Sequence, residues 1–80
     1  MREDVYQVLG KLSPKIMAYD GSDMLKDEII ESMEIMDIVV AMEEHFQMEV
    51  PPELIVPEYF MTKDTIVKLV EDSMKEWNNA

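Results

Sequence analysis

Ser32 is the residue of this chain whose position most suggests chemistry. It stands at the start of an amphipathic segment predicted to be helical, between Glu31 and Met33. Serine is a favoured N-cap residue, so one interpretation is that Ser32 simply begins the helix. The other is that its oxygen carries a phosphate ester, which the positive end of the helix dipole and the free backbone N–H groups there would stabilise.

A hydrolytic site does not fit this sequence. His45 is the only histidine and lies thirteen residues after Ser32 on the same predicted helix. The two residues would be about 20 Å apart, at roughly 1.5 Å per helical residue, whereas a nucleophile and its base must lie within hydrogen-bond distance. We therefore expect His45 to be a surface residue.

Carboxylate pairs are plentiful, but 80 residues arranged as a few helices rarely form the deep cleft that a carboxylate enzyme needs. We expect no enzyme activity and no catalytic residues.

A metal site is not expected either. The chain has no cysteine and a single histidine, so no cluster of nitrogen and sulfur ligands exists. Asp20, Ser22 and Glu31 occupy the first, third and twelfth positions of a calcium-binding EF-hand loop. The fifth position is Met24, which cannot coordinate calcium, and the sixth is Leu25, where the sharp turn needs glycine.

The segment from Ser32 to Phe46 is predicted to be one helix with two apolar faces. At about 100° per residue, one set of apolar residues falls within a narrow sector, which we expect to face the core. This set is Ile35, Ile38, Val39, Met42 and Phe46. A second set falls nearly opposite and consists of Met33, Met36 and Val40.

Four carboxylates surround the second apolar set: Glu34, Asp37, Glu43 and Glu44. One interpretation is that this face is also buried, as in a central helix. Burying unpaired carboxylates is costly, however, so the pattern favours an exposed, methionine-rich strip. Methionine side chains adapt to different shapes, and an exposed apolar patch commonly marks a docking surface.

The other elements follow from apolar spacing and turn residues. We expect a first helix from Asp4 to Leu12 that kinks or ends near Ser13 because of Pro14, with Ile16 and Met17 extending its buried face if it only kinks. A loop should run from Tyr19 to about Ile30. After an extended stretch over 48–52, Pro57 to Phe60 should form one helical turn, and Thr62 should cap a last helix. The expected buried residues are Val5, Val8, Leu9 and Leu12 in the first helix, Tyr59 and Phe60, and Ile66, Leu69, Val70, Met74 and Trp77 in the last.

These elements predict an all-α fold: a small four-helix bundle of three longer helices and one short helix, with a long loop between helices 1 and 2. No linker or repeat interrupts the chain, so residues 1–80 should form a single domain. Hydrophobic residues make up 48% of the chain, which is enough to form a core.

Charge and hydropathy narrow the classes of partner. Eighteen acidic and seven basic residues give a formal net charge of −11. This charge would repel nucleic acids and anionic lipids and attract basic protein surfaces. Another interpretation is that the acidic residues only keep the protein soluble.

No apolar run is long enough to span a membrane and no targeting segment is visible. We therefore expect a cytoplasmic monomer that neither binds nucleic acid nor inserts into membranes.

The segment Glu31 to Phe46 resembles the second helix of acyl carrier proteins. Those helices typically begin Asp-Ser-Leu, alternate acids with aliphatics, and close with Leu-Glu-Glu-x-Phe. Here Glu31-Ser32-Met33 and Met42-Glu43-Glu44-His45-Phe46 occupy the same places. Glu31 in place of aspartate and Met33 in place of leucine are departures that keep charge and bulk. Length, acidity and helix order also agree, so the resemblance covers essentially the whole chain and implies a bundle of acyl-carrier type.

The resemblance implies a function. Ser32 would be esterified with 4′-phosphopantetheine by a phosphopantetheinyl transferase, and the thiol of this arm would carry an acyl or aminoacyl group as a thioester. Other partners would be a loading ligase and a downstream transferase or synthase with basic docking patches, as in fatty acid or polyketide biosynthesis. The positions that match the docking surface of the family are Met33, Glu34, Met36, Asp37, Val40, Glu43 and Glu44.

Two alternatives stand beside this interpretation. From Glu31 to Val67 the chain also resembles the D-alanyl carrier proteins of teichoic acid modification, including Val50-Pro51 and Phe60-Met61-Thr62. Those carriers usually have tryptophan where Phe60 stands and proline where Lys63 stands. An alternative of another class is an unmodified acidic helical module that binds basic proteins through the same methionine-rich strip.

Overall fold

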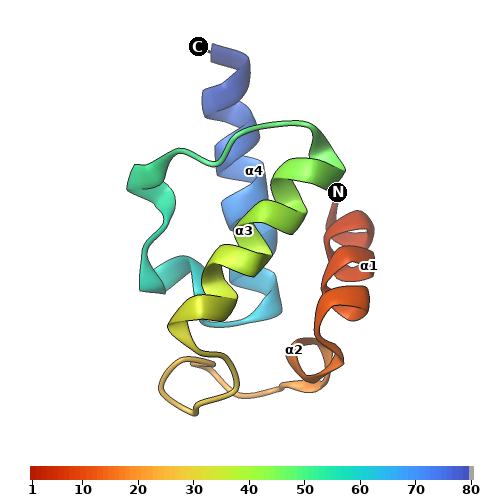
Figure 1. The fold of residues 1–80 in the computed structure, drawn as a ribbon, viewed down its shortest axis with the longest axis vertical. Helices are drawn as coiled ribbons and strands as arrows, with labels where there is room; N and C mark the ends of the chain where they lie inside the picture. The colour runs from red at the N-terminus through yellow and green to blue at the C-terminus, as the bar shows by residue number, and fades with distance from the viewer. Residues whose placement is uncertain (80) are drawn as a thin grey trace.

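The computed structural model describes residues 1–79, which form four α-helices and no strand (Figure 1). This confirms the predicted all-α class. The helices are α1 (Arg2–Leu12), α2 (Pro14–Ala18), α3 (Ser32–Phe46) and α4 (Lys63–Asn79). Two short 3-10 helices, η1 (Pro52–Leu54) and η2 (Pro57–Phe60), lie between α3 and α4. None of the helices in the described chain is long and apolar enough to cross a membrane.

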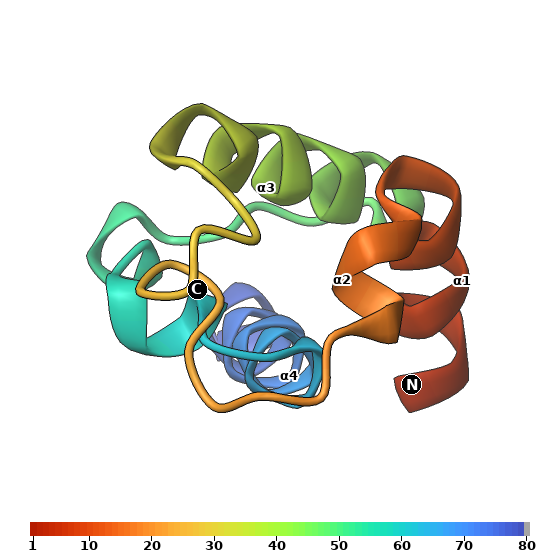
Figure 2. The same ribbon diagram turned by 90° about the horizontal axis from the view of Figure 1, so that it is seen from below.

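The helices surround one apolar core. α1 packs against α2, α3 and α4, while η2 packs against α4. Seen from below, α3 and α4 lie on opposite sides of the centre, α1 closes one flank, and the segment carrying η1 and η2 closes the other (Figure 2). The fully buried side chains come from every part of this arrangement and include Leu9, Ile16, Met24, Ile38, Met42, Phe60, Ile66 and Leu69.

Most element boundaries agree with the sequence prediction. α3 spans the predicted residues, and α1 ends at Leu12, with Ser13 extended at a φ of −157° before Pro14. α1 begins at Arg2 rather than Asp4, because the Val5 N–H donates to the Met1 carbonyl and completes an earlier turn (3.1 Å). The predicted turn at Pro57–Phe60 is a 3-10 helix, and the short α-helix is α2 instead.

Two residues predicted to be buried are exposed instead. Leu12 is 41% exposed, because α1 ends at this residue and the chain turns away into α2. Trp77 is 46% exposed, because it lies near the end of α4 that projects beyond the other helices (Figure 1). The rest of the predicted stripe on α4 faces inward, with Ile66, Leu69 and Val70 fully buried.

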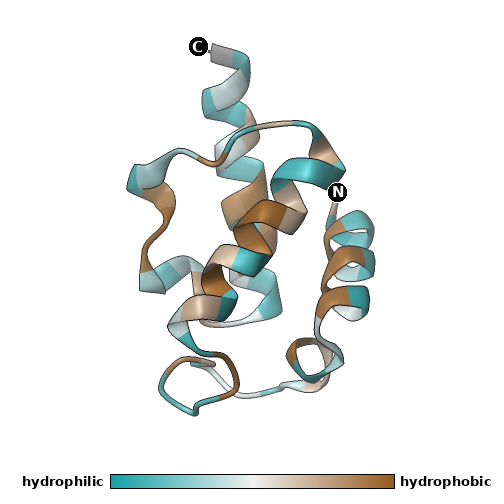
Figure 3. Ribbon diagram, in the orientation of Figure 1, coloured by the Kyte–Doolittle hydropathy of each residue, from teal (hydrophilic) through white to brown (hydrophobic). Residues whose placement is uncertain are grey.

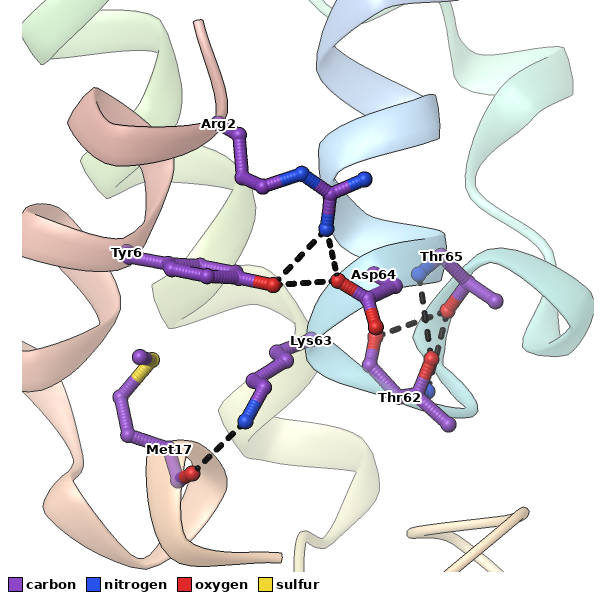
Figure 4. Close-up of polar contacts among 7 residues, drawn as sticks. All are labelled: Arg2, Tyr6, Met17, Thr62, Lys63, Asp64 and Thr65. Atoms are coloured by element: carbon purple, nitrogen blue, oxygen red, sulfur yellow. Dashed lines mark hydrogen bonds and ion pairs between the residues drawn. The ribbon is translucent and has the colours of Figure 1, made fainter. Parts of the chain in front are cut away.

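The first turn of α4 is tied to α1 and α2 by a polar cluster (Figure 4). The Tyr6 hydroxyl donates a hydrogen bond to the Asp64 carboxylate, which also pairs with Arg2. Lys63 donates to the carbonyl of Met17 at 3.1 Å, and its ammonium lies 5.6 Å from the centre of the Tyr6 ring. These contacts hold the end of α2 in place, and α2 in turn reaches the start of α3.

Thr62 caps α4, as predicted. Its hydroxyl accepts a hydrogen bond from the Thr65 N–H at 3.1 Å, and the Thr65 hydroxyl accepts one from the Thr62 N–H at 3.0 Å. The pair satisfies backbone donors that the helix itself cannot satisfy. The position of η2 depends on this cap, because the Thr65 hydroxyl also donates to the Tyr59 carbonyl (2.9 Å).

We expect the Tyr6–Asp64 contact to make stability depend on pH. The hydrogen bond from Tyr6 is the main reason that the pKa of Asp64 lies below its ordinary value of 3.8, and Arg2 lowers it further. A lowered pKa means that the contact stabilises the fold above this ordinary value and is lost as the pH falls through the lowered one. Tyr6→Phe should therefore lower the free energy of unfolding at pH 7, and the difference from wild type should shrink below about pH 4.

Urea unfolding followed by circular dichroism at several pH values measures this difference. In an Asp64→Asn background, Tyr6→Phe should change the free energy of unfolding by the same amount at every pH. If wild type and Tyr6→Phe differ by the same free energy of unfolding at pH 7 and at about pH 2.5, the hydrogen bond from Tyr6 to ionised Asp64 does not stabilise the fold.

Candidate functional site

Ser32 is the first residue of α3, and its side chain is exposed. The N-cap is Glu31, so the interpretation of Ser32 as the cap is wrong. The Glu31 N–H donates to the Glu34 carboxylate at 3.2 Å, and the Glu34 N–H donates to the Glu31 carbonyl at 2.9 Å. Because these glutamates close the helix start, the Ser32 hydroxyl has no hydrogen-bond partner among the described residues.

The backbone around Ser32 also suits an attached anion. The N–H groups of Ser32 and Met33 have no acceptor within residues 1–79, as is usual for the first turn of a helix. The positive end of the α3 dipole points at the same place. Lys15 of α2 pairs with Glu34 at 3.2 Å, so the nearest carboxylate on the first turn is partly neutralised. An ester phosphate on Ser32 therefore fits this environment.

The loop before α3 holds Ser32 in a defined position. Ile30, two residues earlier, is buried at 2% exposure, and the Ile29 N–H donates to the Met24 carbonyl at 2.8 Å. Met24 is itself fully buried, and its N–H donates to the Met61 carbonyl at 2.8 Å. The buried side chain of Met24 thus anchors the loop. Met24 stands at the fifth position of the calcium-loop pattern, where calcium would need a ligand. Over residues 1–79, no group of three acidic, histidine or cysteine side chains is arranged to hold a metal ion.

The second apolar face of α3 is exposed, as predicted. Met33 is 80% exposed, Met36 50% and Val40 46%, and we call these three residues the methionine strip. The opposite face is buried through Ile38, Val39 and Met42, with Ile35 and Phe46 half-buried. Figure 3 shows hydrophobic residues along most of α3, interrupted by hydrophilic ones. One helix therefore contributes to the core and presents apolar surface to solvent.

The four acids predicted to line this strip divide into two pairs. Asp37 and Glu44 are exposed and form no ion pair in the described chain. Glu34 and Glu43 are half-buried and stabilise the two ends of α3. The Glu43 carboxylate accepts a hydrogen bond from the Val50 N–H at 3.0 Å, beyond the left-handed Gln47 (φ 51°) where the helix ends. These structural roles were not predicted, although the spacing of Glu31 and Glu34 is that of a capping box.

Two cavities beside α3 differ in size. A cavity between α3 and the α1–α2 junction, bordered by Leu12, Ile16 and Ile38, has a volume of about 50 Å³. This is room for one or two water molecules. A larger open groove of about 480 Å³ runs between α1 and α3 and includes Val8, Ala41 and the exposed His45.

Comparisons with known proteins identify no relative. No protein-family model, no curated protein and no solved structure matches the chain. The functional interpretation therefore depends on the residues and on their geometry. The strongest feature is an unbonded serine hydroxyl at a helix start, next to an exposed apolar strip with acids beside it.

The capping role of Glu34 can be separated from the acidity of α3. Glu34→Ala removes the acceptor for the Glu31 N–H and the partner of Lys15, so we expect the free energy of unfolding to fall by about 1 kcal/mol. Asp37→Ala makes the same change in charge at an exposed position and should change the free energy of unfolding by less than about 0.5 kcal/mol. Urea unfolding at pH 7 compares the two variants. Equal effects would mean that Glu34 does not cap α3.

Proposed function

We propose that this chain is a carrier protein that tethers acyl or aminoacyl groups as thioesters on a 4′-phosphopantetheine arm attached to Ser32. The observation that supports this most is the exposed Ser32 hydroxyl, which no residue of the described chain engages. The resemblance of residues 31–46 to the recognition helix of acyl carrier proteins supplies the class of chemistry. The proposal covers acyl and aminoacyl cargo alike, D-alanine included.

In this proposal, the residues around Ser32 attach and orient the arm. The phosphopantetheine supplies a flexible chain with a terminal thiol. The Ser32 oxygen forms the phosphate ester, and the free N–H groups of Ser32 and Met33 stabilise its charge. The pairing of Lys15 with Glu34 reduces the repulsion between this phosphate and the first turn of α3. The chain itself performs no catalysis.

Charge segregation supports docking of basic partners on α3. Residues 27–62 include no lysine or arginine, whereas they contain ten carboxylates: Asp27, Glu28, Glu31, Glu34, Asp37, Glu43, Glu44, Glu49, Glu53 and Glu58. The cationic side chains belong to the segments before and after this stretch. A negative field over the methionine strip would steer basic patches of a phosphopantetheinyl transferase, a loading ligase or a downstream transferase toward Ser32.

Mass spectrometry tests the modification directly. After coexpression with a broad-specificity phosphopantetheinyl transferase, the intact mass should rise by one phosphopantetheine group. Ser32→Ala should abolish the addition, while Ser22→Ala, at an exposed serine of the preceding loop, should leave it unchanged. Absence of the addition in the wild-type chain, or its persistence in Ser32→Ala, would reject the carrier function. An unmodified chain that still bound basic proteins would favour the acidic interaction module.

Association kinetics test the docking face. Asp37→Lys should slow association with the same transferase by about three- to tenfold at low salt, because it reverses an exposed charge beside the methionine strip. Glu71→Lys makes the same charge change on α4 and should have a smaller effect. Surface plasmon resonance at increasing salt measures both variants, and added salt should reduce the difference. Equal slowing by the two substitutions would place the docking face elsewhere.

A further inference from the structure

A second surface lies where the segment after α3 meets the last turns of α4. An open groove of about 630 Å³ is formed there, and we call it the Trp77 groove. Its apolar walls are Val50, Pro51, Pro52 and Trp77, and its acidic rim is Glu49, Glu53 and Glu76. We propose that this groove binds a basic peptide segment of a partner protein, with an arginine or lysine side chain lying against the Trp77 ring.

The apolar walls suit a flat or extended cationic side chain. Trp77 is 46% exposed, and tryptophan is the best aromatic ring for a cation–π contact. Pro51, which lines the same groove, is extended at a φ of −59° and a ψ of 136°. Consecutive prolines fix the backbone and lack N–H groups. This wall is therefore preformed, which reduces the entropy lost when a peptide binds.

The rim determines the charge of the occupant. Glu49, Glu53 and Glu76 are all exposed, and none belongs to an ion pair within residues 1–79. No lysine or arginine of the described chain lines the groove. Three unpaired carboxylates around an aromatic ring repel phosphates and fatty carboxylates and attract ammonium or guanidinium groups. Arginine fits best, because its planar guanidinium stacks on an indole while donating to carboxylates.

The Trp77 groove is separate from the Ser32 site. α3 has 15 residues, so its two ends are roughly 22 Å apart at about 1.5 Å per residue. Ser32 begins this helix, whereas the residues that line the groove come from the segment 49–53 after α3 and from the last turns of α4. Figure 1 shows the start of α3 and the C-terminal part of α4 at opposite ends of the molecule. The inference therefore does not depend on the carrier function, and a chain that is never modified at Ser32 could still bind through this groove.

Binding can be measured with a defined probe. The probe is a fluorescein-labelled, amidated peptide of four arginines separated by glycines, and its control replaces each arginine with citrulline, which has a similar shape without the charge. We expect the arginine peptide to bind at least tenfold more tightly by fluorescence anisotropy. An unlabelled arginine peptide should also change the emission of Trp77, which is the only tryptophan of the chain.

Matched variants separate the groove from the general acidity of the chain. Glu53→Gln with Glu76→Gln should weaken binding of the arginine peptide about tenfold. Glu58→Gln with Glu71→Gln removes two exposed carboxylates outside the groove and should weaken it less than about threefold. Trp77→Ala should also weaken it, and circular dichroism confirms that each variant is folded.

Three results would overturn the inference. Equal weakening by the two double variants would mean that the peptide responds only to net charge. Equal binding of the citrulline peptide would mean that the cation is not recognised. Loss of binding in Asp37→Lys that matched the loss in the groove variant would place the peptide on α3. If Trp77→Ala does not fold, the glutamine variants still decide, because they retain the tryptophan and its emission.

Discussion

Burial of one face of α3 is the constraint on which the rest of this structure depends. Ile38, Val39 and Met42 enter the core between α1 and α4, and a helix turns by about 100° per residue. Once these residues are inside, Met33 and Val40 must point outward, because they lie on the opposite side of the same helix. The exposed strip is therefore a consequence of core packing.

The start of α3 is held by its own capping residues and by contacts from α2 and the preceding loop. Glu31 and Glu34 close the helix, Lys15 of α2 pairs with Glu34, and Ile30 anchors the preceding loop in the core. α2 is in turn bound to the first turn of α4 through Lys63. Because other residues satisfy the cap, the Ser32 hydroxyl remains unbonded on a backbone that is well supported. The proposed attachment at Ser32 rests on this arrangement, in which an exposed hydroxyl lies on a supported backbone.

Charge is distributed unevenly along this chain, and the fold keeps the distribution. All seven lysines and arginines lie outside residues 27–62. Four of them have a carboxylate or carbonyl partner. Arg2, Lys63 and Lys68 form contacts between or within α1, α2 and α4, and Lys15 pairs with Glu34 of α3. The intervening segment presents carboxylates without cations of its own. Two different surfaces result: the methionine strip beside Asp37 and Glu44, and the Trp77 groove beside Glu53 and Glu76. Both combine apolar area with carboxylates that belong to no ion pair in the described chain, and the two proposed docking sites rest on this combination.

Local sequence determined the elements whose causes lie within a few residues. Apolar spacing predicted α3 from Ser32 to Phe46, Pro14 predicted the end of α1, and Thr62 predicted the cap of α4. Only the tertiary structure decided which of these residues are covered. Leu12 and Trp77 lie on apolar stripes but are exposed, because Leu12 is the last residue of α1 and Trp77 lies near the end of α4 that projects beyond the other helices. Glu34 and Glu43 look like surface acids, yet one caps α3 and the other holds its exit through Val50. Periodicity shows which side of a helix is apolar, whereas burial and hydrogen bonding depend on contacts between distant parts of the chain.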